Sequence, residues 1–179
     1  MHTRSNHFSD EAIVLRKTIQ KDSNLSITLL TKQHGKCIVT AFGTRRLLSK
    51  RLSHLETGNV IKCTWRENGE FKTLQETDLL YAHSGIKESS TKLDVLYTLL
   101  FIIFKIAPEN EPAVGMYNSL LSTLRELQKK EFTRNDLNAH VTAILIHEGY
   151  ISKEESQQAA FEPIEYVENL MGRKLGKIM

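Results

Sequence analysis

The chain has few of the residues on which metal centres, disulfide frameworks and membrane spans depend. Its 179 residues include two cysteines, Cys37 and Cys63, which form no Cys-x-x-Cys pair. Such usage gives little support for a zinc site or a redox motif and suits a reducing compartment. The longest apolar run, Val95 to Phe104, is too short to cross a bilayer, and residues 1–10 are too polar for a secretory leader. We therefore expect a soluble, cytoplasmic protein.

The sequence also lacks the common motifs of catalysis. It contains neither Gly-x-Ser-x-Gly nor Gly-x-x-x-x-Gly-Lys-Ser/Thr, so acyl transfer and phosphoryl transfer have no visible machinery. His147 and Glu148 begin a His-Glu-x-x-His pattern, but position 151 is isoleucine. We expect His140 and His147 to lie on the surface of one helix. The sequence thus predicts a binding protein rather than an enzyme, with no metal and no cofactor.

Charge is distributed unevenly along the chain. Residues 1–87 hold 14 Lys and Arg against 8 Asp and Glu, whereas residues 88–179 hold 10 against 13. A cationic part joined to a mildly acidic part suggests an anionic partner for the first, either nucleic acid or a membrane surface. A solvated surface without a partner is the alternative.

Residues up to about 80 alternate as β-strands do. Ile61, Cys63 and Trp65 share one face of one segment, so Trp65 is expected in the core. Asn68-Gly69 is a strong hairpin signal. The expected strands are Ala12 to Ile19, Asn24 to Lys32, Lys36 to Thr44, Gly58 to Glu67 and Glu70 to Leu79.

Five short strands with one long connection, between the third and the fourth, predict a small closed barrel. A Greek-key barrel of the OB type is the candidate, because closure leaves no exposed sheet edge. We predict an α+β chain, in which a five-stranded OB-fold β-barrel over residues 1–84 precedes an α-helical domain over residues 85–179.

After residue 88 the apolar residues recur at the spacing of an α-helix. Capping-box patterns open at Thr91, Thr133 and Ser152, Pro108 ends the first helix, and Gly149 suits the end of the third. Helices are expected from Thr91 to Pro108, from Pro112 to Lys130, from Thr133 to Gly149 and from Ile164 to Leu170.

Four cations fall within seven residues directly after the third expected strand. An arginine side chain donates two parallel hydrogen bonds to phosphate, so such a loop suits a phosphate backbone. Two further cations lie four residues apart on the outward face of the next strand. We predict that a nucleic acid binds at Arg45, Arg46, Lys50 and Arg51, supported by Lys62 and Arg66. For Phe42 and Phe71 the sequence leaves two interpretations: the ring stacks on a base, or it packs in the core.

Several segments resemble the RecO family of bacterial DNA repair proteins. The most specific are Glu11 to Leu15, Leu29 to Gly35, Ala41 to Arg46 and Ser49 to Arg51; Lys72 to Glu76, Ala143 to Tyr150 and Tyr166 to Leu175 extend the resemblance.

The resemblance implies a function in DNA repair and recombination. Family members bind single- and double-stranded DNA, anneal complementary strands, and work with RecR to load RecA onto DNA coated by single-strand-binding protein. The acidic, apolar tail of that protein would be expected near the helix from Leu93 to Ala107.

The chain departs from the family pattern in two places. Family members typically carry a four-cysteine zinc module, whereas Gly149 to Glu165 contains no cysteine, and Lys21-Asp22 stands where many members have Gly-Glu. A protein-interaction adaptor that keeps the fold with little DNA affinity is therefore an alternative function. An RNA-binding OB protein is a third.

Overall fold

The computed structural model describes residues 6–20, 24–42, 52–172 and 175. Arg45, Arg46, Lys50 and Arg51 lie outside the described residues, as do Lys21 and Asp22. The chain divides into two compact units, which are described separately below. The first comprises Met1–Ala82 with Ala107–Tyr117, and the second comprises His83–Ile106 with Asn118–Met179.

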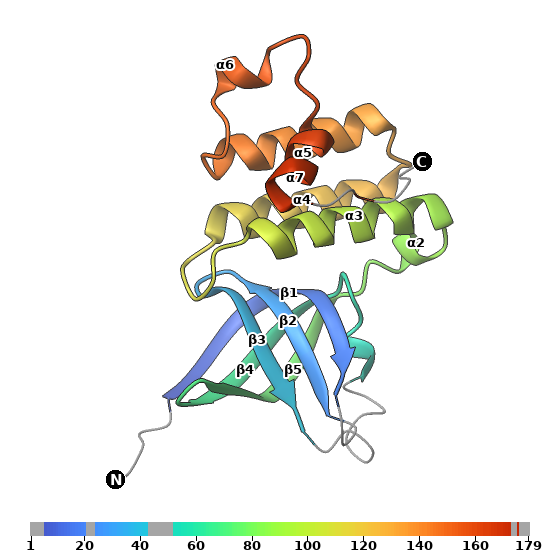
Figure 1. Cartoon of the computed structure of the whole chain (residues 1–179). Coiled ribbons are helices and arrows are strands. Elements are labelled where there is room, and N and C mark those ends of the chain that lie inside the picture. The colour runs from blue at the N-terminus through green and yellow to red at the C-terminus, as the bar shows by residue number, and fades with distance from the viewer. Residues whose placement is uncertain (1–5, 21–23, 43–51, 173–174, 176–179) are drawn as a thin grey trace. The chain divides into compact units, whose positions relative to one another are not determined.

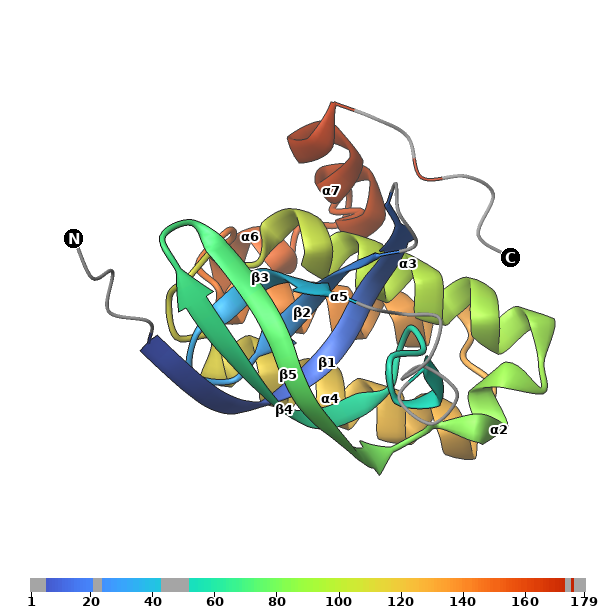
Figure 2. The same cartoon turned by 90° about the horizontal axis from the view of Figure 1, so that it is seen from below.

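Five strands of the first unit close into a barrel in the order β1-β2-β3-β5-β4 (Figures 1 and 2). All neighbours are antiparallel except β3 and β5, which pair in parallel at Thr40 and Thr73. This is the Greek-key barrel of the OB type that the sequence predicts. The strands are β1 (Asn6–Ile19), β2 (Leu25–Thr31), β3 (Gly35–Ala41), β4 (Val60–Asn68) and β5 (Phe71–Tyr81).

β1 begins six residues earlier than its apolar pattern indicates. The residues from Asn6 to Glu11, which are polar except for Phe8, belong to the strand because they pair with β4, from Asn6 opposite Glu67 to Glu11 opposite Lys62. Tertiary pairing overrides the weak local preference of these residues for a strand.

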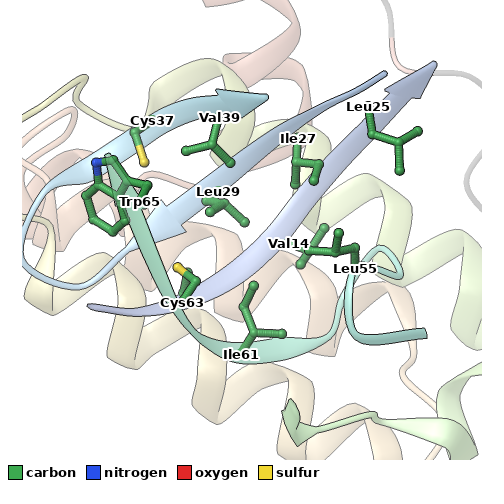
Figure 3. Close-up of a cluster of buried hydrophobic side chains, with 11 residues drawn as sticks. Val14, Leu25, Ile27, Leu29, Cys37, Val39, Leu55, Ile61, Cys63 and Trp65 are labelled. Atoms are coloured by element: carbon green, nitrogen blue, oxygen red, sulfur yellow. The ribbon is translucent and has the colours of Figure 1, made fainter. Parts of the chain in front are cut away.

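The barrel interior is filled by the alternate residues that the sequence assigns to it. Leu25, Ile27 and Leu29 of β2 face Ile61 and Trp65 of β4 across the interior (Figure 3). Trp65 is 1% exposed, which confirms it as a core residue. The side chains drawn in Figure 3 also include Cys37 and Cys63.

The last residues of the long connection between β3 and β4 pack against the barrel core. Residues 52–54 form a helical turn, after which the Leu55 side chain enters the core. Glu56 forms an ion pair with Lys17 at 2.6 Å, and the Asn59 amide donates to the carbonyl of Ser53 at 2.7 Å. These contacts hold residues 53–59 in place before the chain enters β4.

The segment Ala107–Tyr117 packs with the barrel, although it follows a long helix in sequence. The Lys36 N–H donates to the Pro108 carbonyl at 2.7 Å, and the Lys36 ammonium lies 3.3 Å from the Glu109 carboxylate. Gly35 has φ +63°, and the backbone carbonyls of Pro108 and Glu111 lie so close to it that a Cβ atom would not fit. This association is non-local, so the sequence pattern, which places residues 85–179 in one domain, does not reveal it.

The second unit is helical. Thr133 and Ser152 open capping boxes with Asp136 and Glu155, as the sequence predicts. The predicted start at Thr91 is wrong, because the helix begins at Ser90, and the Ser89 hydroxyl accepts from the Lys92 N–H at 3.3 Å. The helices are α2 (Ser84–Lys87), α3 (Ser90–Ile106), α4 (Val114–Lys129), α5 (Arg134–His147), α6 (Lys153–Ser156) and α7 (Pro163–Met171).

Hydrogen bonds from two tyrosine hydroxyl groups connect the C-terminal part of this unit to α3. The Tyr166 hydroxyl donates to the Tyr150 carbonyl at 2.8 Å, and the Tyr150 hydroxyl donates to the Ile106 carbonyl at 3.1 Å. These bonds attach α7 and the turn after α5 to the end of α3. None of the helices in the described part of the chain combines the length and apolarity that a membrane span requires.

Replacing Gly35 by alanine is expected to destabilise the barrel unit by roughly 2–5 kcal/mol, combining left-handed strain with a forced overlap. An added Cβ would lie 2.7 Å from the Pro108 carbonyl oxygen and closer still to that of Glu111. Urea unfolding followed by the fluorescence of Trp65, the single tryptophan, measures the change.

Gly69→Ala is the matched control. Gly69 has φ +62° with nothing within 4 Å of an added Cβ, so only strain of about 1–2 kcal/mol is expected. Equal losses of stability in the two variants would contradict the packing of Pro108 and Glu111 against Gly35.

Candidate nucleic-acid interface

Of the six predicted cations, Lys62 and Arg66 lie among the described residues. Both are exposed on the outer side of β4, as the alternation of that strand predicts. Lys62 stands opposite Glu11 of β1 and Asp78 of β5, whereas Arg66 stands opposite His7 and Thr73. Directly paired cross-strand side chains have Cβ atoms about 5 Å apart, so carboxylates offset the charge of Lys62 on both sides.

The outer surface of β1, β4 and β5 is therefore of mixed charge. Between Lys62 and Arg66, Thr64 lies opposite Ser9 and Glu76. We call this surface the mixed wall and define it by Glu11, Lys62, Thr64, Arg66, Glu76 and Asp78. Its two cations are accompanied by three carboxylates, which weakens its attraction for a polyanion.

A second surface has a different composition. It consists of outward residues of β1, β2, β3 and the start of β5, and two rows cross it. In the first, Arg16 lies opposite Thr28, which lies opposite Ile38. In the second, four hydroxyl residues follow one another across the strands: Thr18, Ser26, Thr40 and Thr73.

We call this second surface the acid-free wall, because the two rows contain no carboxylate. Strands β2 and β3 together carry one charged residue, Lys36. The two walls are neighbouring parts of one outer surface, since Arg66 of the mixed wall lies opposite Thr73 of the acid-free wall. They differ in charge because different segments of β1 and β5 contribute to them. Sequence analysis missed the acid-free wall. The available signal was the pair Ser26 and Thr28 at alternate positions of β2, together with Thr40 of β3.

The aromatic residues left open by the sequence are both exposed. Phe42, directly after β3, is 58% exposed, and Phe71, at the tip of the β4–β5 hairpin, is 79% exposed. Neither belongs to the core. Ile38, on the outer face of β3, is 56% exposed, so three large apolar side chains lie on or beside the acid-free wall.

The residues that the structure describes do not fit a zinc site. Burial raises the pKa of the Cys37 and Cys63 thiols to about 12, and both lie in the barrel core. A thiol must lose its proton to bind zinc, so this environment opposes binding. Over the described residues, no three His, Cys, Asp or Glu side chains gather as metal ligands would.

The two histidines considered for chemistry have local partners instead. His140 lies 3.1 Å from the Glu126 carboxylate and stacks on Phe132, with ring centroids 5.1 Å apart. His147 is exposed and contacts the adjacent Glu148 at 2.9 Å. The contacts of His140 connect α5 to α4 and to the loop between them, whereas that of His147 is local.

Comparison with known proteins agrees with this architecture. Residues 4–83 match the family model described as Recombination protein O N terminal. The DNA repair protein RecO of Thermodesulfovibrio yellowstonii is 29% identical over 126 residues, covering 69% of this chain and 50% of that protein.

Two further relatives carry the same description. DNA repair protein RecO of Bifidobacterium animalis subsp. lactis is 29% identical over 127 residues, covering 68% of this chain and 52% of the relative. That of Myxococcus xanthus is 25% identical over 150 residues, covering 83% and 62%. The chain thus spans about half the length of the first two relatives.

We predict that the purified chain holds no stoichiometric zinc. Its two thiols are buried and protonated at neutral pH, so they offer no thiolate to the metal. Elemental analysis after dialysis against metal-free buffer measures the content. One zinc per chain would refute the prediction.

Proposed function

This chain belongs to the RecO family of DNA repair proteins, and on that premise we propose that it is a recombination mediator without catalytic activity. In this proposal it binds single- and double-stranded DNA, anneals complementary strands and assists RecA loading together with RecR. The observation that carries the proposal is the match of residues 4–83 to the family, over a barrel of the OB type.

Phosphate neutralisation supplies most of the affinity in this proposal. In the sequence, Arg45, Arg46, Lys50 and Arg51 lie between the end of β3 at Ala41 and Leu52, which packs against the barrel core. Binding of a strand releases its counterions, so affinity falls steeply with salt and depends little on base sequence.

Lys62 and Arg66 have unequal supporting roles in this proposal. Arg66 has no carboxylate directly opposite, whereas Lys62 has one on each side. We therefore assign Arg66 the larger phosphate contribution and Lys62 a smaller one.

Annealing requires no bond chemistry. A polycation that binds two strands at once lowers the repulsion between their phosphates, and base pairing then provides the driving force. None of the steps calls for a nucleophile or a general base, in keeping with a function as a mediator.

A partner surface is proposed on α3 for an acidic, apolar peptide such as the tail of single-strand-binding protein. Tyr97 is 55% exposed, and the Lys105 ammonium lies 5.6 Å from the Phe101 ring centre and 5.7 Å from that of Phe104. A cation held over aromatic rings suits a peptide that carries both carboxylates and apolar side chains.

Replacing Arg45, Arg46, Lys50 and Arg51 together by alanine is expected to abolish most DNA binding. Each lost contact lowers the slope of log affinity against log salt by about 0.7 for a single strand, so the slope should fall by up to about 3. Fluorescence anisotropy of a labelled oligonucleotide at several salt concentrations measures both quantities, and an RNA of the same sequence tests for an RNA preference.

The control carries the same change in net charge. It replaces four exposed lysines of the helical unit by alanine: Lys87, Lys105, Lys129 and Lys153. If the first variant bound DNA at moderate salt with unchanged affinity, the assignment of DNA binding to these four residues would be wrong. Absence of salt-dependent binding by the unaltered chain would favour the adaptor function.

For the peptide surface, Lys105→Glu is expected to weaken binding of an acidic, apolar peptide by about tenfold, because it replaces an attraction by a repulsion. Lys129→Glu, an exposed lysine at the end of α4, is the control and should leave the affinity unchanged. Calorimetric titration of the full chain measures both. Equal affinities for the two variants would contradict a site on α3.

A further inference from the structure

Two lysines beside the acid-free wall have partners that come from other parts of the barrel unit. Lys36 lies on the outward face of β3 and is the single charged residue of β2 and β3. Its ammonium group lies 3.3 Å from the Glu109 carboxylate. The Lys72 ammonium, at the start of β5, lies 3.2 Å from the Glu67 carboxylate and also donates to the Asn110 side chain. These two cations are therefore paired within the molecule.

The segment that contacts both lysines is held to the barrel by its backbone. We call it the acidic arm and define it by Glu109, Asn110 and Glu111, all of which are exposed. The Lys36 N–H donates to the Pro108 carbonyl just before the arm, and the Asn110 N–H donates to the Lys36 carbonyl at 3.3 Å. Asn110 has φ +58°, a left-handed conformation that asparagine adopts more readily than most residues. These backbone bonds fix the arm beside Lys36.

The ion pair between the arm and Lys36 is easier to separate than the backbone bonds. The Glu109 side chain is 70% exposed, whereas that of Lys36 is 12% exposed. Water solvates an exposed carboxylate and salt screens its charge, so an ion pair of this kind contributes little to stability. The Glu109 carboxylate can therefore leave the Lys36 ammonium while the backbone of the arm stays in place.

A DNA phosphate has the chemistry to replace that carboxylate. Both groups are anions that offer two oxygen atoms, and both accept charge-assisted hydrogen bonds from an ammonium group. The rows of the acid-free wall contain no carboxylate, so Glu109 brings beside them a negative charge that their own strands do not supply. The arm therefore opposes a polyanion at a wall whose own rows do not repel one.

We propose that the acidic arm is an autoinhibitory element, in which Glu109 occupies Lys36 in the free protein and yields it to a phosphate when DNA binds. This inference rests on the proposed DNA-binding function and adds a device that limits the affinity. Because DNA must displace a carboxylate before it gains the contact with Lys36, the net gain from that contact is small. A mediator whose affinity is limited in this way releases annealed strands more readily.

The first experiment neutralises the arm and follows DNA binding by fluorescence anisotropy. Glu109→Gln keeps the size of the side chain and removes its charge, so a phosphate no longer competes with a carboxylate for Lys36. The affinity for a single-stranded oligonucleotide should rise about threefold at low salt, and the slope of log affinity against log salt should steepen by about 0.7. Affinity for duplex DNA should also rise, because the competing group is the phosphate.

Glu111→Gln is the matched control. It makes the same change in net charge at another exposed position of the same arm. Only the general field of the protein changes in this variant, so the affinity should rise by less than about 1.5-fold and the salt slope should stay the same.

The second experiment tests whether the effect depends on Lys36. Because Glu109 competes for this ammonium in the unaltered chain, Lys36→Gln alone should change the affinity by less than about twofold. In the Lys36→Gln background, Glu109→Gln should leave the salt slope unchanged, since this ammonium is no longer there for a phosphate to contact. Its effect on the affinity should then equal that of Glu111→Gln.

Urea unfolding followed by Trp65 fluorescence shows whether each variant keeps the barrel folded. Equal effects of Glu109→Gln and Glu111→Gln would overturn the inference while leaving DNA binding intact, and so would weaker DNA binding by Glu109→Gln. If neither the unaltered chain nor Glu109→Gln bound DNA at low salt, the proposed function would fail. Binding by Glu109→Gln but not by the unaltered chain would support the inference.

Discussion

Closure of the five-stranded sheet is the constraint on which the rest of the barrel unit depends. β1 pairs with β4 over eight residues, while β3 meets β5 in parallel at Thr40 and Thr73. Once the sheet is closed, each strand residue points either into the barrel interior or to its outer side, where some residues, such as Ile13 and Leu30, are also buried. The apolar set that includes Trp65 and Leu29 fills the interior, so the intervening residues must form the outer walls.

The walls show why the net charge of a segment is a poor guide to the charge of a surface. The first 87 residues are cationic overall, yet Lys62 lies between two carboxylates that come from strands far apart in sequence. The acid-free wall has few cations, but it has no carboxylate in its rows.

Much of the fold could be predicted because its signals are local. The alternation in β2 and β4, the Asn68-Gly69 hairpin and the capping boxes at Thr133 and Ser152 each depend on neighbours a few residues away. The features that were missed depend on distant partners. The start of β1 at Asn6 requires β4, and the packing of Ala107–Tyr117 requires the Gly35 turn.

The sequence by itself determined which residues of each strand are apolar, and therefore that Trp65 is buried while Lys62 and Arg66 face solvent. It also placed Phe42 beside a cationic segment, without deciding whether the ring is buried. The tertiary structure decided which outward residues become neighbours: Glu11 and Asp78 beside Lys62, and Ile38 beside Thr28. The physical reason is that alternation acts along one strand, whereas strand order and register bring together side chains that no local interaction connects.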